Sequence, residues 1–361
     1  MSNQTQTYSS VSPIQLLDFL TRCLDYINPR TGVRPPILIK GPPGVGKTDV
    51  NYQAVKKYCN THGEGAADII VCHPVVDEPI DYKGLPWIGK DGDADFKPIG
   101  QLRKFLTAEV PTLVVFDDLG QAPQSTQAAA MQLVLNREIN GLKISDEIMF
   151  TACTNRKEDQ AGVGGLIEPL KSRFATILEL YVTTDDWLVW ARHHGMPTEL
   201  IAYLTWKPSE LMQFEPTPDI VNTATPRTVA SVGDLVNMGL PREISRPVIY
   251  GAAGEGFGVQ FMEFMEVMNE IPTAQYCLEN PEEVGIPTRE DLRWAMCASV
   301  SESVTKKYMK NFLILLNRMP QEYSVAAMQM ATTRDVKLRQ TSTFGQWIKE
   351  NTLVLVNPFA S

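Results

Sequence analysis

The segment Pro35-Pro36-Ile37-Leu38-Ile39-Lys40-Gly41-Pro42-Pro43-Gly44-Val45-Gly46-Lys47-Thr48 decides the fold of this chain. It predicts a buried strand, a glycine-rich loop and a helix that opens at Lys47. The loop matches the whole G-x-x-x-x-G-K-[ST] pattern, in which glycines allow successive backbone N–H groups to turn inward around phosphate oxygens. We therefore expect a nucleotide to bind at eight residues: Gly41, Pro42, Pro43, Gly44, Val45, Gly46, Lys47 and Thr48.

Two side chains of this loop have separate roles in the prediction. Lys47 is expected to reach the β- and γ-phosphates, and Thr48 to ligate Mg²⁺. The N-terminus of the following helix adds the positive end of its dipole. The alternative is a Gly/Pro-rich turn without a ligand, and the complete motif between a strand and a helix argues against it.

The bulk composition is that of a globular protein inside the cell. At 361 residues the chain exceeds the usual size of one hydrophobic core, so two packed units are expected. No apolar run is long enough to span a bilayer, and the polar start does not resemble a signal peptide. The six cysteines are scattered without a C-x-x-C pair, which favours a reduced, cytoplasmic setting. The net charge of −9 argues against a general nucleic-acid groove.

Short apolar segments that alternate with helical patterns predict the first unit. The segments cover 37–40, 68–72, 112–116, 148–153 and 175–181. This alternation is typical of an α/β fold with a parallel sheet and helices on both faces, whose ligands bind at the carboxyl ends of the strands. We expect a disordered tail over 1–11, the α/β nucleotide-binding domain over 12–182, and an all-helical lid and C-terminal region over 183–361.

A polar insert from Asp77 to Phe105 separates two of these strands. It reads as a hairpin placed in or beside a helix. Asp91, Asp93 and Asp95 alternate as in a calcium-binding EF-hand loop, but the pattern then lacks the glycine and the glutamate that such a loop requires. We interpret these acids as a solvated hairpin tip.

Acidic and amide side chains follow two of the strands. Asp117 is expected to hold Mg²⁺ through water, and Asp118 to polarise the attacking water as a base. Asn155 can hydrogen-bond both the γ-phosphate and that water. An Asn or Asp at a strand end is also ordinary turn chemistry, and only the phosphate loop upstream gives these positions meaning.

Two arginines complete the candidate site. Arg173 lies in Ser172-Arg173-Phe174, just before the fifth apolar segment, and Arg227 lies in Thr225-Pro226-Arg227-Thr228 at a predicted helix start. An arginine that stabilises the charge of a transferring phosphoryl group accelerates the reaction by orders of magnitude. As lone arginines both would be ordinary surface residues.

In this order the motifs resemble those of an AAA+ ATPase. The resemblance covers roughly Ser12 to Met238 and is carried by GPPGVGKT (41–48), LVVFDD (113–118), Asn155, SRF (172–174) and PRT (226–228). More narrowly the chain resembles the MoxR-type branch. In that branch a Gln/Ala-rich helix follows the acidic residues at the nucleotide site, and here the segment 121–128 follows Asp117 and Asp118 in the same way.

This resemblance implies a ring, usually a hexamer, with ATP between neighbouring subunits. Arg173 would act in trans as the arginine finger and Arg227 in cis as a second sensor. The insert would face the central channel, where Trp87-Ile88-Gly89 has the order of loops that grip polypeptide. The alternative is that Trp87 anchors the insert on its own core. AAA+ proteins typically have Asp-Glu where this chain has Asp117-Asp118, and the shorter carboxylate predicts slower hydrolysis, hydrolysis that depends on subunit closure, or a non-hydrolysing switch.

The expected function is therefore ATP hydrolysis that remodels or activates a partner protein. MoxR-type proteins commonly work with a protein that carries a von Willebrand factor A domain, which makes such a partner a reasonable expectation. Two alternatives remain open: a nucleic-acid motor or loader of the same superfamily, and a nucleotide-gated assembly scaffold that hydrolyses slowly or not at all.

Overall fold

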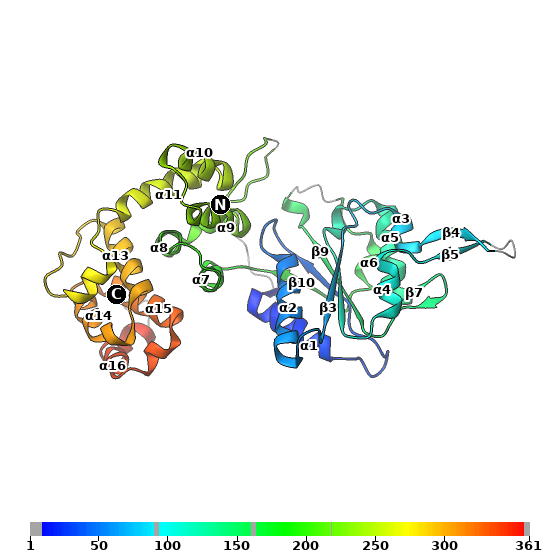
Figure 1. Cartoon of the computed structure of the whole chain (residues 1–361), viewed down its shortest axis with the longest axis horizontal. Helices are drawn as coiled ribbons and strands as arrows, with labels where there is room; N and C mark the ends of the chain where they lie inside the picture. The colour runs from blue at the N-terminus through cyan, green and yellow to red at the C-terminus, as the bar shows by residue number, and fades with distance from the viewer. Residues whose placement is uncertain (1–8, 90–93, 160–163, 218, 357–361) are drawn as a thin grey trace. The chain divides into compact units, whose positions relative to one another are not determined.

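The computed structural model describes residues 9–89, 94–159, 164–217 and 219–356. The chain divides into two compact units, which are treated separately below (Figure 1). The first comprises Met1–Thr183 with Glu215–Pro218, and the second comprises Thr184–Phe214 with Asp219–Ser361.

Within the described residues, the first unit contains a six-stranded sheet in which all neighbouring strands are parallel (Figure 1). Its spatial order is β1-β10-β2-β9-β6-β3. The strands are β1 (Ser10–Val11), β2 (Ile37–Lys40), β3 (Asp68–Cys72), β6 (Thr112–Phe116), β9 (Ile148–Thr154) and β10 (Thr176–Leu180). All five predicted strands are present.

Burial on both faces explains why the central strands are continuously apolar. In β6 and β9 every residue is buried, as expected for a parallel sheet between two helical layers. Successive side chains point to opposite faces. Phe116 and Phe150 belong to a core cluster with Ala129, Ala130 and Leu133 of helix α5 (Gln124–Asn136).

Helices α1 (Pro13–Asp25) and α2 (Lys47–His62) pack against each other, and α2 also packs on β6 and β3. Figure 1 shows them on one side of the sheet and α4–α6 on the other. Ser12 caps α1 through a capping box with Gln15, which agrees with the predicted Ser-Pro helix start. The first unit is thus a three-layered α/β structure.

The predicted disorder over 1–11 is wrong for its last residues. Ser10 and Val11 form β1, and the main chain of 9–11 accepts hydrogen bonds from Glu179 N–H and Tyr181 N–H, both at 3.0 Å. Without β1, strand β10 would be the edge of the sheet, and its backbone groups on that side can pair with a segment regardless of how polar it is. Residues 1–8 lie outside the described part of the chain.

The insert consists of α3 (Pro79–Lys83), an antiparallel hairpin of β4 (Leu85–Ile88) and β5 (Ala94–Lys97), and α4 (Gln101–Thr107). This confirms the predicted hairpin beside a helix. The interpretation of Trp87 as a core anchor is wrong, because its side chain is 57% exposed, with the Lys97 ammonium 5.5 Å from its ring. Asp91 and Asp93, from the disfavoured calcium pattern, lie outside the described residues.

The remaining elements of the first unit are short. The Asn140-Gly141 turn joins β7 (Glu138–Ile139) to β8 (Leu142–Lys143), with φ of 50° and 79° at its two central residues. Positive φ at both positions is the geometry that Asn-Gly favours in a hairpin. Helix α6 (Glu168–Lys171) precedes β10.

The second unit is helical throughout its described residues. Its helices are α7 (Thr184–His193), α8 (Thr198–Trp206), α9 (Pro226–Asn237), α10 (Arg242–Ala253), α11 (Glu255–Met268), α12 (Ala274–Glu279), α13 (Glu290–Ser303), α14 (Met309–Leu316), α15 (Gln321–Arg334) and α16 (Ser342–Val356). Tyr203 of α8 packs against three aromatic rings of α11, with centroids 5.5–5.6 Å away, at Phe257, Phe261 and Phe264. This aromatic cluster fixes α8 on α11.

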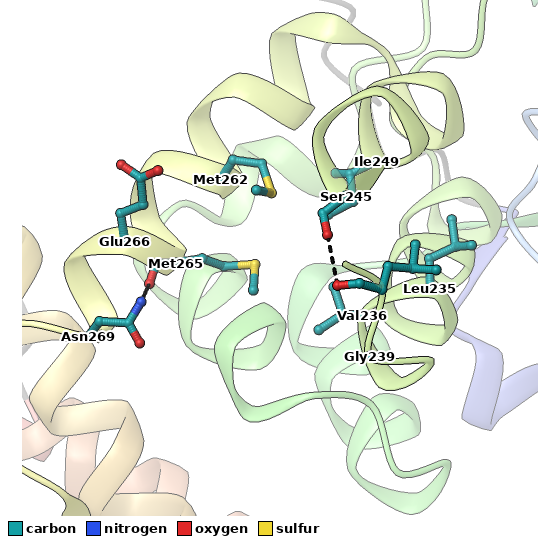
Figure 2. A pocket seen from close by; sticks show the side chains of 10 residues that line it. Leu235, Val236, Gly239, Ser245, Ile249, Met262, Met265, Glu266 and Asn269 are labelled. Atoms are coloured by element: carbon teal, nitrogen blue, oxygen red, sulfur yellow. Dashed lines mark hydrogen bonds between the residues drawn. The ribbon is translucent and has the colours of Figure 1, made fainter. Parts of the chain in front are cut away.

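A mostly apolar cavity of about 390 Å³ lies between α9, α10 and α11 (Figure 2). Met262 and Met265 line it from α11, and Leu235 and Val236 line it from α9. Ser245 closes its polar side, where its hydroxyl donates to the Leu240 carbonyl at 3.2 Å. Within the described residues no helix combines the length and apolar character that crossing a membrane requires.

The predicted fold class is confirmed. A parallel sheet with flanking helices carries the phosphate-loop sequence after one of its central strands, and a helical region follows, as in the P-loop AAA+ fold.

Candidate nucleotide-binding site

The glycine-rich loop connects the end of β2 to the start of α2, as the sequence predicts. Gly44 and Gly46 have φ of 73° and 86°, which side chains with a Cβ rarely adopt. A Cβ at Gly41 would lie 3.1 Å from the Leu180 carbonyl oxygen, so this position also has little room. The loop therefore needs its glycines for backbone conformation and for close packing.

Lys47 lies at the centre of the site and is only 7% exposed. Its ammonium donates to the carbonyls of Gly41 at 3.1 Å and Pro42 at 2.8 Å, and to Asn155 Oδ1 at 2.7 Å. Burial lowers the pKa of Lys47, while nearby Asp118 and Asp117 act in the opposite direction. The chain thus holds a cation at the loop by surrounding it with oxygen acceptors.

Thr48 and Asp117 meet beside this lysine. The Thr48 hydroxyl donates to Asp117 Oδ1 at 2.7 Å, which brings together the first turn of α2 and the end of β6. A hydroxyl and a carboxylate supply the hard oxygen ligands that Mg²⁺ prefers, and Mg²⁺ in nucleotide sites takes only one or two protein ligands. The donor set therefore fits Mg²⁺.

Asp118 follows directly and adopts a left-handed backbone conformation, with φ of 52°. It precedes a 3-10 turn over Leu119–Gln121, whose Gln121 N–H donates to the Asp118 carbonyl at 2.9 Å. Asp and Asn tolerate this conformation better than longer or branched residues do. The backbone here favours the shorter acid.

Asn155 reaches the site because β9 lies between β2 and β6 in the sheet. The three strands run parallel, so their carboxyl ends deliver Lys47, Asp117 and Asn155 to the same edge. Strand pairing thus brings together Lys47, Asp117 and Asn155, which were predicted from three separate motifs.

Arg173 lies at the opposite edge of the sheet. It precedes β10, and Ala175 N–H donates to the Pro36 carbonyl at the start of β2, whereas Lys47 follows the end of that strand. The strands between these edges span roughly 15 Å. The structure does not bring Arg173 to the Lys47 site of its own unit, and its buried Nε has no hydrogen-bond partner among the described residues.

Arg227 belongs to the second unit, in the first turn of α9, where its side chain is exposed. Thr225 caps this helix by a capping box with Thr228. The indole N–H of Trp187 donates to the Pro226 carbonyl at 3.1 Å and ties α9 to α7. These contacts fix the start of the helix that carries Arg227.

A partly buried ion network beside Asn155 was not predicted from the sequence. Arg156 contacts Asp159 at 2.7 Å and Glu179 at 3.5 Å, and Glu179 contacts Lys40 at 3.0 Å. Asp159, 4% exposed, also accepts the Arg156 backbone N–H at 3.1 Å. The network joins the carboxyl ends of β2, β9 and β10. Its only sequence signal is charge at each strand end, which is common at surfaces.

A second set of contacts that was not predicted is made by Asn51, on the side of α2 that faces the sheet. Asn51 is fully buried in α2, donates to the Lys47 carbonyl at 2.8 Å, and accepts from the Thr151 hydroxyl of β9 at 3.0 Å. The sequence signal for this contact was an asparagine on the buried face of the helix that follows the phosphate loop. It holds the first turn of α2 against the strand that carries Asn155.

No protein-family model matches this chain, and no curated protein matches it. Its fold resembles that of the P216G mutant of RuvB from Thermotoga maritima, with 15% identity, a TM-score of 0.41, and coverage of 77% of this chain and 80% of that one. NtrX from Brucella abortus, solved in complex with ADP, shares 15% identity at a TM-score of 0.40, over 98% of this chain and 70% of that one. The function proposed below therefore rests on this chain's own residues.

Proposed function

We propose that this protein is a MoxR-like AAA+ ATPase that couples ATP binding and hydrolysis in an oligomeric ring to the remodelling or activation of a partner protein. The observation that carries the proposal is the convergence of Lys47, Thr48, Asp117 and Asn155 at the carboxyl edge of a parallel sheet, linked by hydrogen bonds of 2.7 Å. These are the residue types that phosphoryl transfer from a nucleoside triphosphate requires at this edge.

The reaction proposed is attack of water on the γ-phosphorus of ATP. The bond from the γ-phosphorus to the β–γ bridging oxygen breaks, so ADP leaves, and the proton of the water passes to Asp118 and then to solvent. Lys47 neutralises phosphate charge, and Asn155 orients the water and a γ-phosphate oxygen. Thr48 and Asp117 would hold Mg²⁺, which when bound neutralises charge on the β- and γ-phosphates.

The position of Arg173 supports a site shared between subunits. Within one chain it lies at the sheet edge opposite Lys47, so it serves this reaction only in the site of a neighbouring subunit. A ring, usually a hexamer in this superfamily, places such an arginine against each nucleotide. We propose that Arg173 acts in trans as the arginine finger and Arg227 in cis as a second sensor.

The partner proposed is a protein, and one with a von Willebrand factor A domain is our first choice. The exposed apolar side chains of the β4–β5 hairpin support a polypeptide ligand: Leu85, Trp87, Ile88 and Phe96 are 44–73% exposed. Large apolar side chains grouped on a monomer surface are typical of protein-binding sites. Cytoplasmic location remains part of the proposal.

The test is the ATPase rate of wild type, Lys47→Ala and Arg173→Ala, with ring formation followed by native mass spectrometry. We expect both variants to lose most turnover. Lys47→Ala should lose it because the loop no longer holds the phosphates, whereas Arg173→Ala should keep its nucleotide affinity. Undiminished turnover in either variant would refute the mechanism. Stimulation by DNA or RNA, and not by protein, would favour the motor alternative.

The scaffold alternative has one observation in its favour, the short Asp118 carboxylate on a left-handed backbone. If wild type binds ATP and forms rings without turnover, Asp118→Glu distinguishes the two functions. Hydrolysis gained by this variant would show that the chain is a nucleotide-gated scaffold.

A further inference from the structure

Gln127 is a buried polar residue in the first turns of α5 that the proposed mechanism does not use. Its side chain is 1% exposed, yet α5 lies against the apolar core of the first unit. A buried amide is stable only when its donors and its acceptor are paired. The partners of Gln127 show what it connects.

All of its hydrogen-bonding groups reach backbone of two separate segments. Nε2 donates to the Ala122 carbonyl at 3.0 Å and to the Gly165 carbonyl at 3.1 Å. Oε1 accepts from Ile167 N–H at 3.0 Å. The amide therefore joins the turn before α5 to the segment before α6.

The first of these segments carries the acids of the candidate site. Ala122 ends the 3-10 turn that starts after Asp118, and its own N–H donates to the Leu119 carbonyl at 3.3 Å. Asp118 and the carbonyl that Gln127 holds therefore lie at the two ends of one short hydrogen-bonded turn.

The second segment carries Arg173. Ile167 precedes α6 directly, and Leu170 of α6 is fully buried in the same core as α5. Arg173 N–H donates to the Leu170 carbonyl at 3.0 Å. The backbone from Gly165 to Arg173 thus forms one short, packed connection.

We propose that Gln127 is a positioning residue that couples the acid-bearing turn of a subunit's own site to Arg173, which completes the neighbouring site. This inference rests on the proposed function and adds to it the regulation of the shared site. A change at Asp118, on binding or release of the γ-phosphate, then reaches the neighbour through two backbone segments and one side chain.

The amide chemistry makes this link specific. Glutamate at 127 would aim a carboxylate at the carbonyls of Ala122 and Gly165 and lose both donors, and leucine would leave all three backbone groups unpaired. Gln127→Leu therefore keeps the volume and removes the link. Thr126→Val is the matched control, because Thr126 is equally buried but bonds the Asp77 carbonyl at 3.3 Å in another segment.

The first measurement is hydrogen exchange of the full chain with ADP, which does not depend on turnover. Gln127→Leu should accelerate exchange at Ile167 and over 164–174, with little change over 47–58. Thr126→Val should leave 164–174 protected. Unchanged exchange at Ile167 in Gln127→Leu, in a protein that circular dichroism shows to be folded, would overturn the inference.

The second measurement asks whether the effect reaches a neighbour. Wild-type subunits are mixed one to one with Asn155→Ala subunits, which should still bind ATP and donate Arg173 but hydrolyse ATP about a hundredfold more slowly. About half of the wild-type sites in such a ring take their arginine from a variant, so adding Arg173→Ala to that variant should lower turnover per wild-type subunit about twofold. We expect Gln127→Leu in the same background to match this decrease, and Thr126→Val to match Asn155→Ala alone.

The outcomes separate the two proposals. If Asn155→Ala/Gln127→Leu subunits depress their neighbours no more than Asn155→Ala subunits do, Gln127 acts only within its own subunit and the coupling is refuted. If wild type hydrolyses no ATP, the proposed function fails and the coupling fails with it. That result appears before any Gln127 variant is mixed, so the two failures are distinguishable.

Discussion

Lys47 and Asn155 are separated by 108 positions in the sequence, and the buried lysine ammonium donates to the buried asparagine Oδ1 at 2.7 Å. The contact joins the phosphate loop to the neighbouring strand end. The three donors of the ammonium are used by Gly41 O, Pro42 O and Asn155 Oδ1, so a phosphate must replace at least one of these acceptors. Until then the contacts hold the cation at the loop.

Asn155→Ala should lower the kcat for ATP by about a hundredfold, because it removes a preorganised polar group from the reacting phosphate. The KM should change little, since Lys47 and the loop remain. Steady-state kinetics with purified rings measures both constants. An unchanged kcat would show that Asn155 only supports the lysine.

Replacing Lys47 by methionine should change how stability depends on pH. Burial lowers the pKa of Lys47 below its ordinary value of 10.5, so the unfolded chain keeps this proton to higher pH than the folded one. Between the folded pKa and 10.5 the unfolded state binds more protons, and wild-type stability therefore rises with pH relative to Lys47→Met. Urea unfolding of both proteins at pH 7 and pH 10 measures the difference. A difference that moves the other way would contradict this assignment.

Asp159→Asn should lower the free energy of unfolding by about 2 kcal/mol, because it removes the main partner of the half-buried Arg156 guanidinium. The pKa of Arg156 is raised chiefly by its hydrogen bond to Asp159, which agrees with a strong pair. The control is Lys143→Ala, which breaks an exposed 2.9 Å pair with Asp146 and should cost under about 1 kcal/mol. Equal losses in the two variants would contradict the role of the network.

Substitution of two aromatic residues of the insert should affect stability to very different extents. Tyr82 is 3% exposed and its hydroxyl donates to Asp77 at 2.5 Å, so Tyr82→Phe should lower stability by about 2 kcal/mol. Trp87→Ala should change it by less than about 0.5 kcal/mol, because that side chain is mostly exposed. Thermal and urea unfolding measure both. A large loss in Trp87→Ala would indicate packing that the structure does not have.

The buried thiols should react slowly and destabilise the fold at high pH. Burial raises the pKa of Cys23 to about 11 and that of Cys72 and Cys153 to about 12, from 9.0. Their contribution to stability is complete below pH 9 and is lost as the pH rises from there towards the folded pKa. At pH 8 we expect iodoacetamide to modify Cys59, which is half-buried, before the other cysteines. Mass spectrometry of digests gives the order, and prior labelling of Cys153 would contradict it.

Local patterns predicted most of the first unit because its signals are short-range. The five strands, the Ser12 cap and the Asn140-Gly141 turn each depend on neighbouring residues. Ser10 and Val11 were missed because their partner, β10, is remote and the segment is polar. Trp87 remained ambiguous, since burial depends on the whole fold.

For the site, the sequence predicted the residues of the nucleotide motifs but not the residues that contact and support them. Lys47, Thr48, Asp117 and Asn155 follow from motifs at strand ends. Asn51, Gln127 and the Arg156 network do not, because ordinary polar residues acquire their roles through contacts between distant segments. That Arg173 lies away from the Lys47 site follows only from the register of β10 on β2.

The strand order also constrains the synthesis of this protein. β2, which carries the phosphate loop, pairs with β9 and β10, and these begin at residues 148 and 176. On the ribosome, the backbone N–H and C=O groups of Ile37–Lys40 have no native strand partner until most of the first unit has emerged. Pairing between strands so distant in sequence is slow, and until it occurs the unpaired strand edges can associate with other chains. The segment that defines the binding site is thus among the last to become native, and the nascent chain depends on protection from aggregation until then.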